Sequence, residues 1–216
     1  MRWPSIHFVL HFAPVLAALS FSSVAHSQIL LNGSFESPIF GSTQNLAGAF
    51  SLGAWSGFGP SNGGNAGLVV GVDNGLGPAS GSQHFTFNGG NPSDQGWIEQ
   101  TFSTVPGTSY VVEFAIGRSG GGQALSLLAS VSGLGSLASA SFSPAASAGY
   151  SVASFAFVAD HSSVVLRFAD TSGGNSVSDL YLDSVSVMAA VPEPAVSAVV
   201  LGVAAAGLVG WRRRRR

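Results

Sequence analysis

The sequence predicts an all-β protein whose strands form an antiparallel β-sandwich of the jelly-roll type. The first indication is the alternation in residues 108–117, where Tyr110, Val112, Phe114 and Ile116 share one parity. A period of two residues places such side chains on one face of a strand. The second is that similar short runs recur along the chain between glycine-rich turns. The third is that residues 28–190 contain no sustained helical period, so strands and turns account best for this region.

Seven further strands are predicted, at residues 67–73, 82–88, 96–105, 124–131, 151–158, 164–169 and 180–188. Clusters of Gly, Ser, Asn and Pro lie between or beside them, at residues 62–64, 88–92, 120–122 and 172–175. These residue types favour turns. Residues 137–148 are rich in alanine and could form a helix, but Pro144 and the alternating serines favour strand and loop.

The C-terminal residues 191–216 have three parts. They are the motif Val191-Pro192-Glu193-Pro194, an apolar stretch at 195–211, and the arginines Arg212, Arg213, Arg214, Arg215 and Arg216. The prolines favour an extended, exposed motif. A helix over the apolar stretch would extend about 25 Å, which suits a transmembrane helix in a hydrocarbon core about 30 Å thick. The arginines would keep that end in the cytoplasm. The alternatives are an ordinary membrane anchor or a buried apolar helix.

This tail resembles the PEP-CTERM sorting signal of Gram-negative bacteria, with Pro192-Glu193-Pro194 as the motif that names the family. The resemblance implies that an exosortase-type membrane transpeptidase cleaves near the motif. It also implies that the protein then passes to the cell surface or the extracellular matrix. Contact with the membrane through the C-terminal helix would therefore be transient, as it is for a GPI signal.

The N-terminal residues 1–27 have the pattern of a signal peptide. Arg2 supplies the positive start, residues 6–19 are mostly apolar, and Ala25-His26-Ser27 offers small residues to a signal peptidase. Cleavage is expected after Ser27, with Ala25 as the alternative. We therefore expect a signal helix at this end and export through the inner membrane.

Residues 28–190 form the expected β-sandwich domain, a single unit without a charged or proline-rich linker. This region contains two arginines, Arg118 and Arg167, and nine acidic residues, which give it a net charge of −7. An acidic surface without lysine repels phosphate backbones, so nucleic acid is not expected as a partner. The chain has no cysteine, which excludes disulfides and thiolate chemistry.

Both ends of this domain carry a second resemblance. The segments are Leu31-Asn32-Gly33-Ser34-Phe35-Glu36-Ser37-Pro38, followed by Trp55-Ser56-Gly57, and Leu180-Tyr181-Leu182-Asp183-Ser184-Val185-Ser186-Val187. They are similar to the opening and closing motifs of galactose-binding-like jelly rolls, which include DUF642-type proteins and some carbohydrate-binding modules. The resemblance implies that the terminal strands run side by side and that a carboxylate from each holds a structural calcium ion. The matching residues are Glu36 and Asp183. Ser184 stands where the family often has a second Asp, which leaves fewer ligands.

The position of Asp183 in its strand gives calcium some independent support. Asp183 shares parity with Tyr181, Val185 and Val187, so we expect it to point toward the apolar face. A charged carboxylate there is costly unless it is paired or bound to a cation such as calcium. The alternative is that Asp183 accepts backbone N–H groups at a strand bend while Glu36 remains solvated.

Sugar binding would need flat aromatic rings and short polar side chains on one surface. The side chains that could supply them are Trp55, Phe58, His84, Asn88, Asn91, Asp94, Gln95 and Trp97. Trp55, Trp97 and Asp94 are the predicted ligand-binding residues, and the last two belong to the aromatic and polar stretch at residues 87–97. The alternative is that the tryptophans are core residues, because large rings dominate the packing of β-sandwiches. For Trp97 this alternative gains support from the alternating residues Ile98, Gln100 and Phe102 that follow it.

The expected function is a non-catalytic surface or matrix protein, structural or associated with exopolysaccharide. His84 and His161 lie in no hydrolase motif, and no glycine-rich run has the lysine of a phosphate loop. The alternative is a secreted hydrolase that acts on polysaccharide. A hydrolase would place two carboxylates, or a histidine and a carboxylate, in one open cleft. A binding protein would present aromatic rings on a shallow face.

Overall fold

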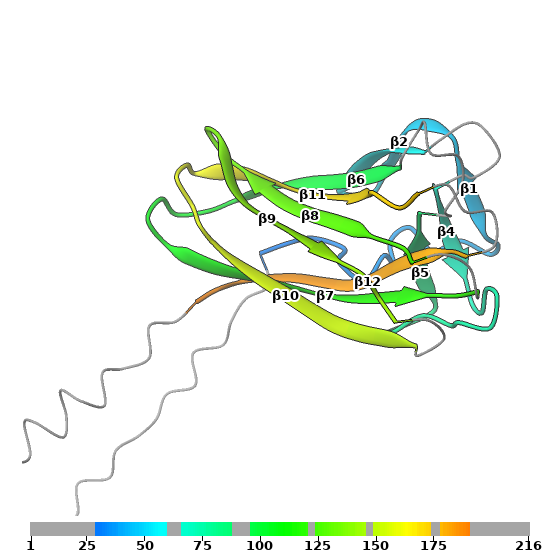
Figure 1. The fold of residues 1–216 in the computed structure, drawn as a ribbon. Coiled ribbons are helices and arrows are strands. Elements are labelled where there is room, and N and C mark those ends of the chain that lie inside the picture. The colour runs from blue at the N-terminus through cyan, green and yellow to red at the C-terminus, as the bar shows by residue number, and fades with distance from the viewer. Residues whose placement is uncertain are drawn as a thin grey trace, which may run out of the picture.

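The computed structural model describes residues 29–59, 66–87, 96–120, 124–145, 149–173 and 178–190. Within these ranges, twelve strands form two six-stranded sheets in which all pairs run antiparallel. The sheets lie face to face as the two layers of a sandwich (Figure 1). The prediction of an all-β antiparallel sandwich is therefore confirmed.

The first sheet has the order β1-β4-β5-β12-β7-β10. Its strands are β1 (Gln44–Leu46), β4 (Ala66–Val70), β5 (Gln83–Thr86), β12 (Leu180–Ala189), β7 (Ser109–Arg118) and β10 (Tyr150–Val158). The second sheet has the order β2-β3-β6-β11-β8-β9. Its strands are β2 (Gly48–Leu52), β3 (Trp55–Gly59), β6 (Trp97–Ser103), β11 (Ser163–Asp170), β8 (Leu127–Ser132) and β9 (Ser136–Phe142).

The strands from β4 onward agree with the predicted runs, and β9 accounts for the strand expected near residue 137. The sequence did not predict β1, β2 and β3, because β1 has only three residues and β2 and β3 contain three glycines, a residue that is depleted in strands. The glycines are needed for close approach. A Cβ atom on Gly57 would collide with the Phe50 ring, and one on Gly59 would collide with the Leu46 carbonyl.

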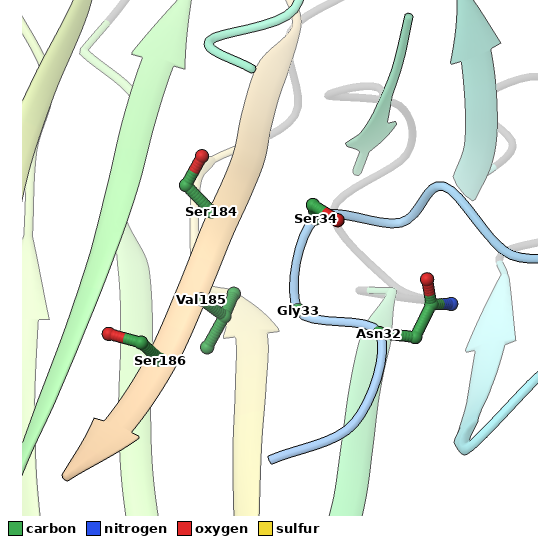
Figure 2. A pocket seen from close by; sticks show the side chains of 6 residues that line it. All are labelled: Asn32, Gly33, Ser34, Ser184, Val185 and Ser186. Atoms are coloured by element: carbon green, nitrogen blue, oxygen red, sulfur yellow. The ribbon is translucent and has the colours of Figure 1, made fainter. Parts of the chain in front are cut away.

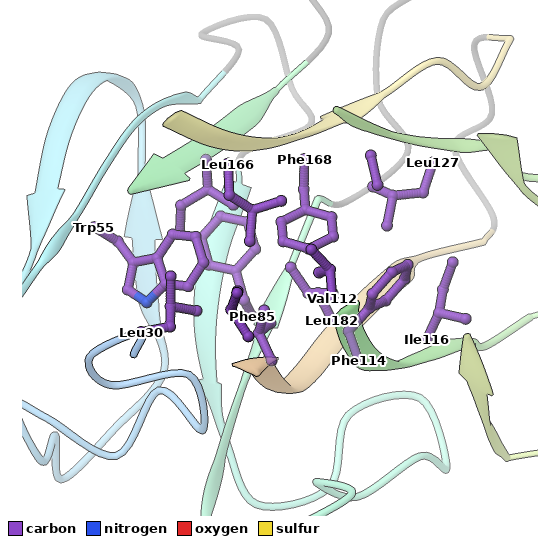
Figure 3. Close-up of a cluster of buried hydrophobic side chains, with 14 of the residues drawn as sticks. Leu30, Trp55, Phe85, Val112, Phe114, Ile116, Leu127, Leu166, Phe168 and Leu182 are labelled. Carbon is purple, nitrogen blue, oxygen red and sulfur yellow. The ribbon is translucent and has the colours of Figure 1, made fainter. Parts of the chain in front are cut away.

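Aromatic side chains from both sheets fill the space between the layers (Figure 3). Phe35 lies 5.5 Å from Trp55 and 5.7 Å from Phe85, and Phe114 lies 4.9 Å from Phe168, measured between ring centroids. All five side chains are at most 1 % exposed. Burial of so much aromatic area is the main favourable contribution to the stability of this domain.

The N-terminal segment 29–38 runs beside β12, as the second resemblance implied. The Ile29 amide donates to the Val187 carbonyl and the Val185 amide donates to the Gly33 carbonyl. The buried Gln100 side chain forms two hydrogen bonds of 2.8 Å with the backbone of Leu31. Gln83, also buried, binds the backbone of residues 35, 38 and 40. These two glutamines hold the first segment of the domain against both sheets.

A β-bulge interrupts β12. The register against β7 shifts between Asp183 and Ser186, and Ser184 has a φ of 52°. Because of this extra residue, Tyr181 and Asp183 point to the outer face of the first sheet, whereas Val185 and Val187 point into the core. The expectation that Asp183 shares the apolar face with Val185 and Val187 is wrong, since it assumed an uninterrupted period of two.

Residues 71–82, which we term the cover segment, lie over this outer face. Leu76 packs against Gly117 of β7, and the Ser80 amide donates to the Asp183 carboxylate. As a result His84, Tyr181 and Asp183 are completely buried although they point away from the core. Figure 1 shows no equivalent layer over the outer face of the second sheet within the coloured residues.

The expected terminal helices cannot be compared with the structure. The signal peptide at 1–27, the Val191–Pro194 motif, the transmembrane stretch at 195–211 and the arginines 212–216 all lie outside the described residues. Within the described ranges, no helix is long and apolar enough to cross a membrane.

Candidate functional site

The three predicted sugar-binding residues do not form one surface. Trp55 is 1 % exposed, and its indole Nε1 donates a hydrogen bond of 2.9 Å to the Asn32 carbonyl. Trp55 belongs to the hydrophobic core and presents no face to a ligand, so it is not a binding residue. Asp94 lies outside the described residues.

Trp97, by contrast, lies on the outer face of the second sheet. Along β6, Ile98, Gln100 and Phe102 are buried and face inward, whereas Trp97 is partly exposed. The alternative that Trp97 is a core residue therefore does not hold, because the inward parity belongs to its neighbours. Its direct partner on β3 is Phe58, which is also partly exposed.

An ion pair lies beside the Trp97 ring. Arg167 of β11 and Glu99 of β6 are direct cross-strand partners, and the Arg167 Nε lies 2.7 Å from Glu99 Oε2. The guanidinium carbon of Arg167 is 4.0 Å from the centroid of the Trp97 ring, a cation–π arrangement. The two charged side chains are 43 % and 26 % exposed. An ion pair this exposed adds little stability, so its value is the fixed orientation of donors and acceptors next to an indole.

We term Phe58, Trp97, Glu99 and Arg167 the Trp97 site. Its chemistry combines an aromatic surface with N–H donors from the guanidinium and oxygen acceptors from the carboxylate. Phe58 was among the side chains that could bind sugar, whereas Glu99 and Arg167 were not predicted to lie beside Trp97. Alternation within 96–105 and 164–169 could have placed Glu99 and Arg167 on outward faces, but the pairing of their strands is not visible in the sequence.

The two predicted calcium ligands hold the same part of the cover segment. Asp183 accepts the amides of Ser80 at 3.0 Å and of Ser184 at 2.6 Å. Glu36 accepts the amides of Ser82 and Gln83 and the Ser82 hydroxyl, each at 2.8 Å. The backbone N–H bonds expected in the alternative are thus present at Asp183, and Glu36 is bonded to the protein as well.

These carboxylates also influence each other. Burial raises the pKa of Asp183 to about 6, and repulsion from Glu36 also raises it. The backbone N–H bonds to Asp183 act in the opposite direction and lower this pKa. Burial also pushes the pKa of Glu36 up, but its hydrogen bonds from Ser82 and Gln83 outweigh this and leave it lowered. Both side chains offer the hard oxygen atoms that calcium prefers, and further oxygen atoms would have to complete the roughly six to eight ligands that it takes.

A pocket of about 300 Å³ lies next to this region, between the N-terminal segment and the bulge of β12. It is lined by Asn32, Gly33, Ser34, Ser184, Val185 and Ser186, and Figure 2 shows the N-terminal segment running alongside the strand. The lining offers hydroxyl and backbone groups but no aromatic ring, so its chemistry differs from that of the Trp97 site.

A third polar cluster is enclosed by the cover segment. The His84 ring stacks on Tyr181 at 4.8 Å, and its Nδ1 is hydrogen bonded to the Tyr150 hydroxyl. The Tyr181 hydroxyl lies 2.9 Å from Asp73 and 3.3 Å from Asp179. Burial lowers the pKa of His84 to about 4, although the charge of Asp73 opposes this. No group of three or more His, Cys, Asp or Glu suited to a metal ion occurs in the ranges that the structure describes.

The fold and its clamped N-terminal segment define a two-sheet jelly-roll domain. A family model described as "Protein of unknown function (DUF642)" matches residues 28–187. The match covers well over half of the sequence, so the chain belongs to the DUF642 family. This confirms the resemblance of the domain ends. No curated protein matches the chain.

Solved structures resemble the chain at low sequence identity. One, described as "a putative sugar binding protein" from Bacteroides thetaiotaomicron VPI-5482, has a TM-score of 0.52 and 9 % identity, over 76 % of this chain and 100 % of that one. TmCBM61, solved with beta-1,4-galactotriose, has a TM-score of 0.44 and 12 % identity, over 76 % and 99 %. Tailspike protein 4 of bacteriophage CBA120 has a TM-score of 0.49 and 12 % identity, over 76 % of this chain and 21 % of that one. The chain thus spans about a fifth of the tailspike domain. At such identities the similarity concerns the fold.

The buried histidine predicts a pH dependence of stability. His84 titrates near 6.5 in the unfolded chain and at about 4 in the folded one, so between these values the unfolded state binds more protons. We expect the free energy of unfolding to fall by up to about 3 kcal/mol from this group as the pH drops from 6.5 to 4. His84→Asn, which keeps an acceptor for Tyr150, should flatten this part of the profile. Urea unfolding at a series of pH values measures it, with the exposed His161→Asn as the control. Equal slopes in wild type and His84→Asn would contradict the prediction.

Proposed function

We propose that this protein is an exported, non-catalytic polysaccharide-binding protein of the cell surface or extracellular matrix, and that it binds through the Trp97 site. The observation that carries the proposal is the partly exposed Trp97 ring with the Glu99–Arg167 pair beside it. Sugar rings have one apolar face and a rim of hydroxyl groups, so they are bound by an aromatic surface with adjacent donors and acceptors.

A binding role accords with the surroundings of the acidic residues. Glu36 and Asp183 are engaged with the cover segment, and Asp73 and Asp179 with the Tyr181 hydroxyl. Glu99 lies on a sheet face and is paired with Arg167. These arrangements supply structural roles for Glu36, Asp73, Asp179 and Asp183, and they leave Glu99 as part of the binding site. The solved Bacteroides protein with the same fold is described as "a putative sugar binding protein", which is consistent with a carbohydrate-associated role here.

Sorting by an exosortase-type system is the second part of the proposal. It is supported by the Val191–Pro194 motif, the apolar stretch 195–211 and the five terminal arginines. Signal peptidase would remove residues 1–27, and the transpeptidase would separate the sandwich domain from its membrane helix. The binding domain would then reach the exopolysaccharide outside the cell.

The third part of the proposal is a structural calcium ion held by Glu36 and Asp183. Their carboxylates repel each other, and both secure the cover segment through backbone amides. A cation bound to the native state would strengthen the contact between the N-terminal segment, β12 and this segment.

Replacement of Trp97 tests the binding site. Trp97→Ala removes the ring that a sugar would stack on, and we expect the affinity for the bound polysaccharide to fall by at least about tenfold, or about 1.4 kcal/mol. Affinity electrophoresis in gels that contain the polysaccharide measures this. Val152→Ala, at an exposed position on the other sheet, is the control. Equal mobility of wild type and Trp97→Ala in every retarding gel would contradict the proposal.

Sorting predicts a shortened protein at the cell surface. Intact-mass spectrometry of surface-extracted protein should give a chain that begins near Gln28 and ends near Pro194, because the transpeptidase discards the membrane helix. A Glu193→Ala variant should accumulate in the membrane with its tail still attached. A peptide containing residues 212–216 in the extracellular fraction of wild type would refute this part of the proposal.

The proposed calcium site predicts a melting temperature that depends on a chelator. A ligand that binds only the native state stabilises it by about 2.7 kcal/mol at a hundredfold excess over Kd, so EDTA should lower the Tm of wild type. Asp183→Asn retains an acceptor but loses the charge, and its Tm should respond little to EDTA. Asp160→Asn, at an exposed site, should respond as wild type does. A wild-type Tm that is unaffected by EDTA would favour the purely hydrogen-bonded arrangement.

A further inference from the structure

The Trp97 site is the centre of two parallel rows of side chains that cross the outer face of the second sheet. Direct cross-strand pairing joins one residue from each of its six strands. The first row, which we term the polar row, consists of Ser51, Ser56, Glu99, Arg167, Ser130 and Ser139. The second, which we term the apolar row, consists of Ala49, Phe58, Trp97, Ala169, Leu128 and Ser141.

The rows are neighbours along every strand, because each member of one row is two residues from a member of the other. Residues two apart share a face and are separated by about 7 Å. None of the twelve side chains is buried. The outer face therefore presents a mostly apolar band, with Trp97 and Phe58 in it, beside a band of hydroxyls and one ion pair.

The length of the rows indicates the shape of the ligand. Six strands have five gaps of about 4.8 Å, so each row is about 24 Å long. A single sugar would use the centre of such a band, whereas a linear chain of several sugars could contact it from β2 to β9. A chain that follows the rows would lie perpendicular to the strands, because each row consists of direct cross-strand partners.

The charges indicate the kind of chain. Apart from Glu99 and Arg167, the polar row contains serines alone, so its net charge is zero over its whole length. A hydroxyl group both donates and accepts hydrogen bonds, and the ion pair offers acceptors on one side and donors on the other. A uronate would instead bring its negative charge next to Glu99, in a domain whose net charge between residues 28 and 190 is −7.

We infer that the ligand is a neutral, linear polysaccharide that lies across the strands, with its sugar faces on the apolar row and its hydroxyls on the polar row. This inference rests on the proposed function, since it assumes that Trp97 binds sugar. It adds the class of polysaccharide, the direction of the chain and the residues that extend the site beyond Trp97.

The experiment measures binding by isothermal titration calorimetry with the exported protein. The probes are oligomers of two and six units from three neutral glycans (β-1,4-glucan, β-1,4-mannan and β-1,4-galactan) and from alginate as the uronate. We expect at least one neutral hexamer to bind at least about tenfold more tightly than its dimer, because it contacts more of the rows. Alginate hexamers should bind at least about tenfold more weakly than that neutral hexamer.

Two variants test the rows away from the tryptophan. The double variant Ser130→Val and Ser139→Val removes two hydroxyls on β8 and β9, and β-branched residues are well tolerated in strands. It should weaken hexamer binding several-fold and weaken dimer binding less, because Ser139 lies at the end of the row. Ser154→Val, at an exposed position on β10 of the other sheet, should change neither.

A third variant tests the neutral ion pair. Glu99→Gln leaves the charge of Arg167 uncompensated. It should therefore weaken binding of the neutral hexamer and raise the ratio of alginate affinity to neutral-hexamer affinity. Glu113→Gln removes the same charge from an exposed position of β7 on the other sheet, and should leave this ratio unchanged.

The outcomes separate this inference from the proposed function. Equal affinity for dimer and hexamer, with binding still lost in Trp97→Ala, would overturn the inference and leave the Trp97 site standing. A wild-type preference for alginate would do the same. Absence of binding to every probe would overturn both the inference and the proposed function. A protein homodimer that dissociates in Trp97→Ala would also overturn both, because the face would then be an interface between two copies of the chain.

Discussion

The bulge at Ser184 is the constraint on which the arrangement of this domain depends. It allows one strand to serve two purposes: Val185 and Val187 pack in the core, while Tyr181 and Asp183 point outward on the same sheet. A non-glycine residue with a positive φ is uncommon, and here it accompanies the hydrogen bond from the Ser184 amide to the Asp183 side chain. The cover segment encloses these outward side chains, and the hydrogen bond from the Ser80 amide compensates for part of the cost of burying the Asp183 carboxylate.

The two outer faces of the sandwich therefore differ in kind. The cover segment closes the outer face of the first sheet around His84, Tyr181 and Asp183. Its Asp73 and Ser80 are hydrogen bonded to Tyr181 and Asp183, while His84 is bonded to Tyr150 of β10. On the second sheet the pairs at Glu99 and Trp97 continue across all six strands, so its outward side chains align in rows. This contrast explains why a histidine and several acidic residues belong to a closed structural cluster while a single tryptophan defines the candidate binding site.

The opening motif of the family has a structural role at nearly every position. Asn32 accepts the Ser37 amide through its side chain and the Trp55 indole N–H through its carbonyl. Phe35 enters the core, and Glu36 binds the amides at the end of the cover segment. Gln83 and Gln100 then bind the backbone around the motif. A buried polar side chain is tolerated only when its hydrogen bonds are made, so these contacts specify one position for the N-terminal segment.

The sequence by itself determined the all-β class, the strands β4 to β8 and β10 to β12 apart from their exact ends, and the acidic character of the domain. These follow from a period of two residues and from a residue count, which are local properties. It also indicated the family through its terminal motifs. It did not determine which face Trp55, Trp97 and Asp183 occupy. Those positions depend on close approach at the glycines of β3, on one extra residue in β12, and on which strands become neighbours. Glu99 and Arg167 are 68 residues apart in the chain, and only the pairing of β6 with β11 brings them together beside Trp97.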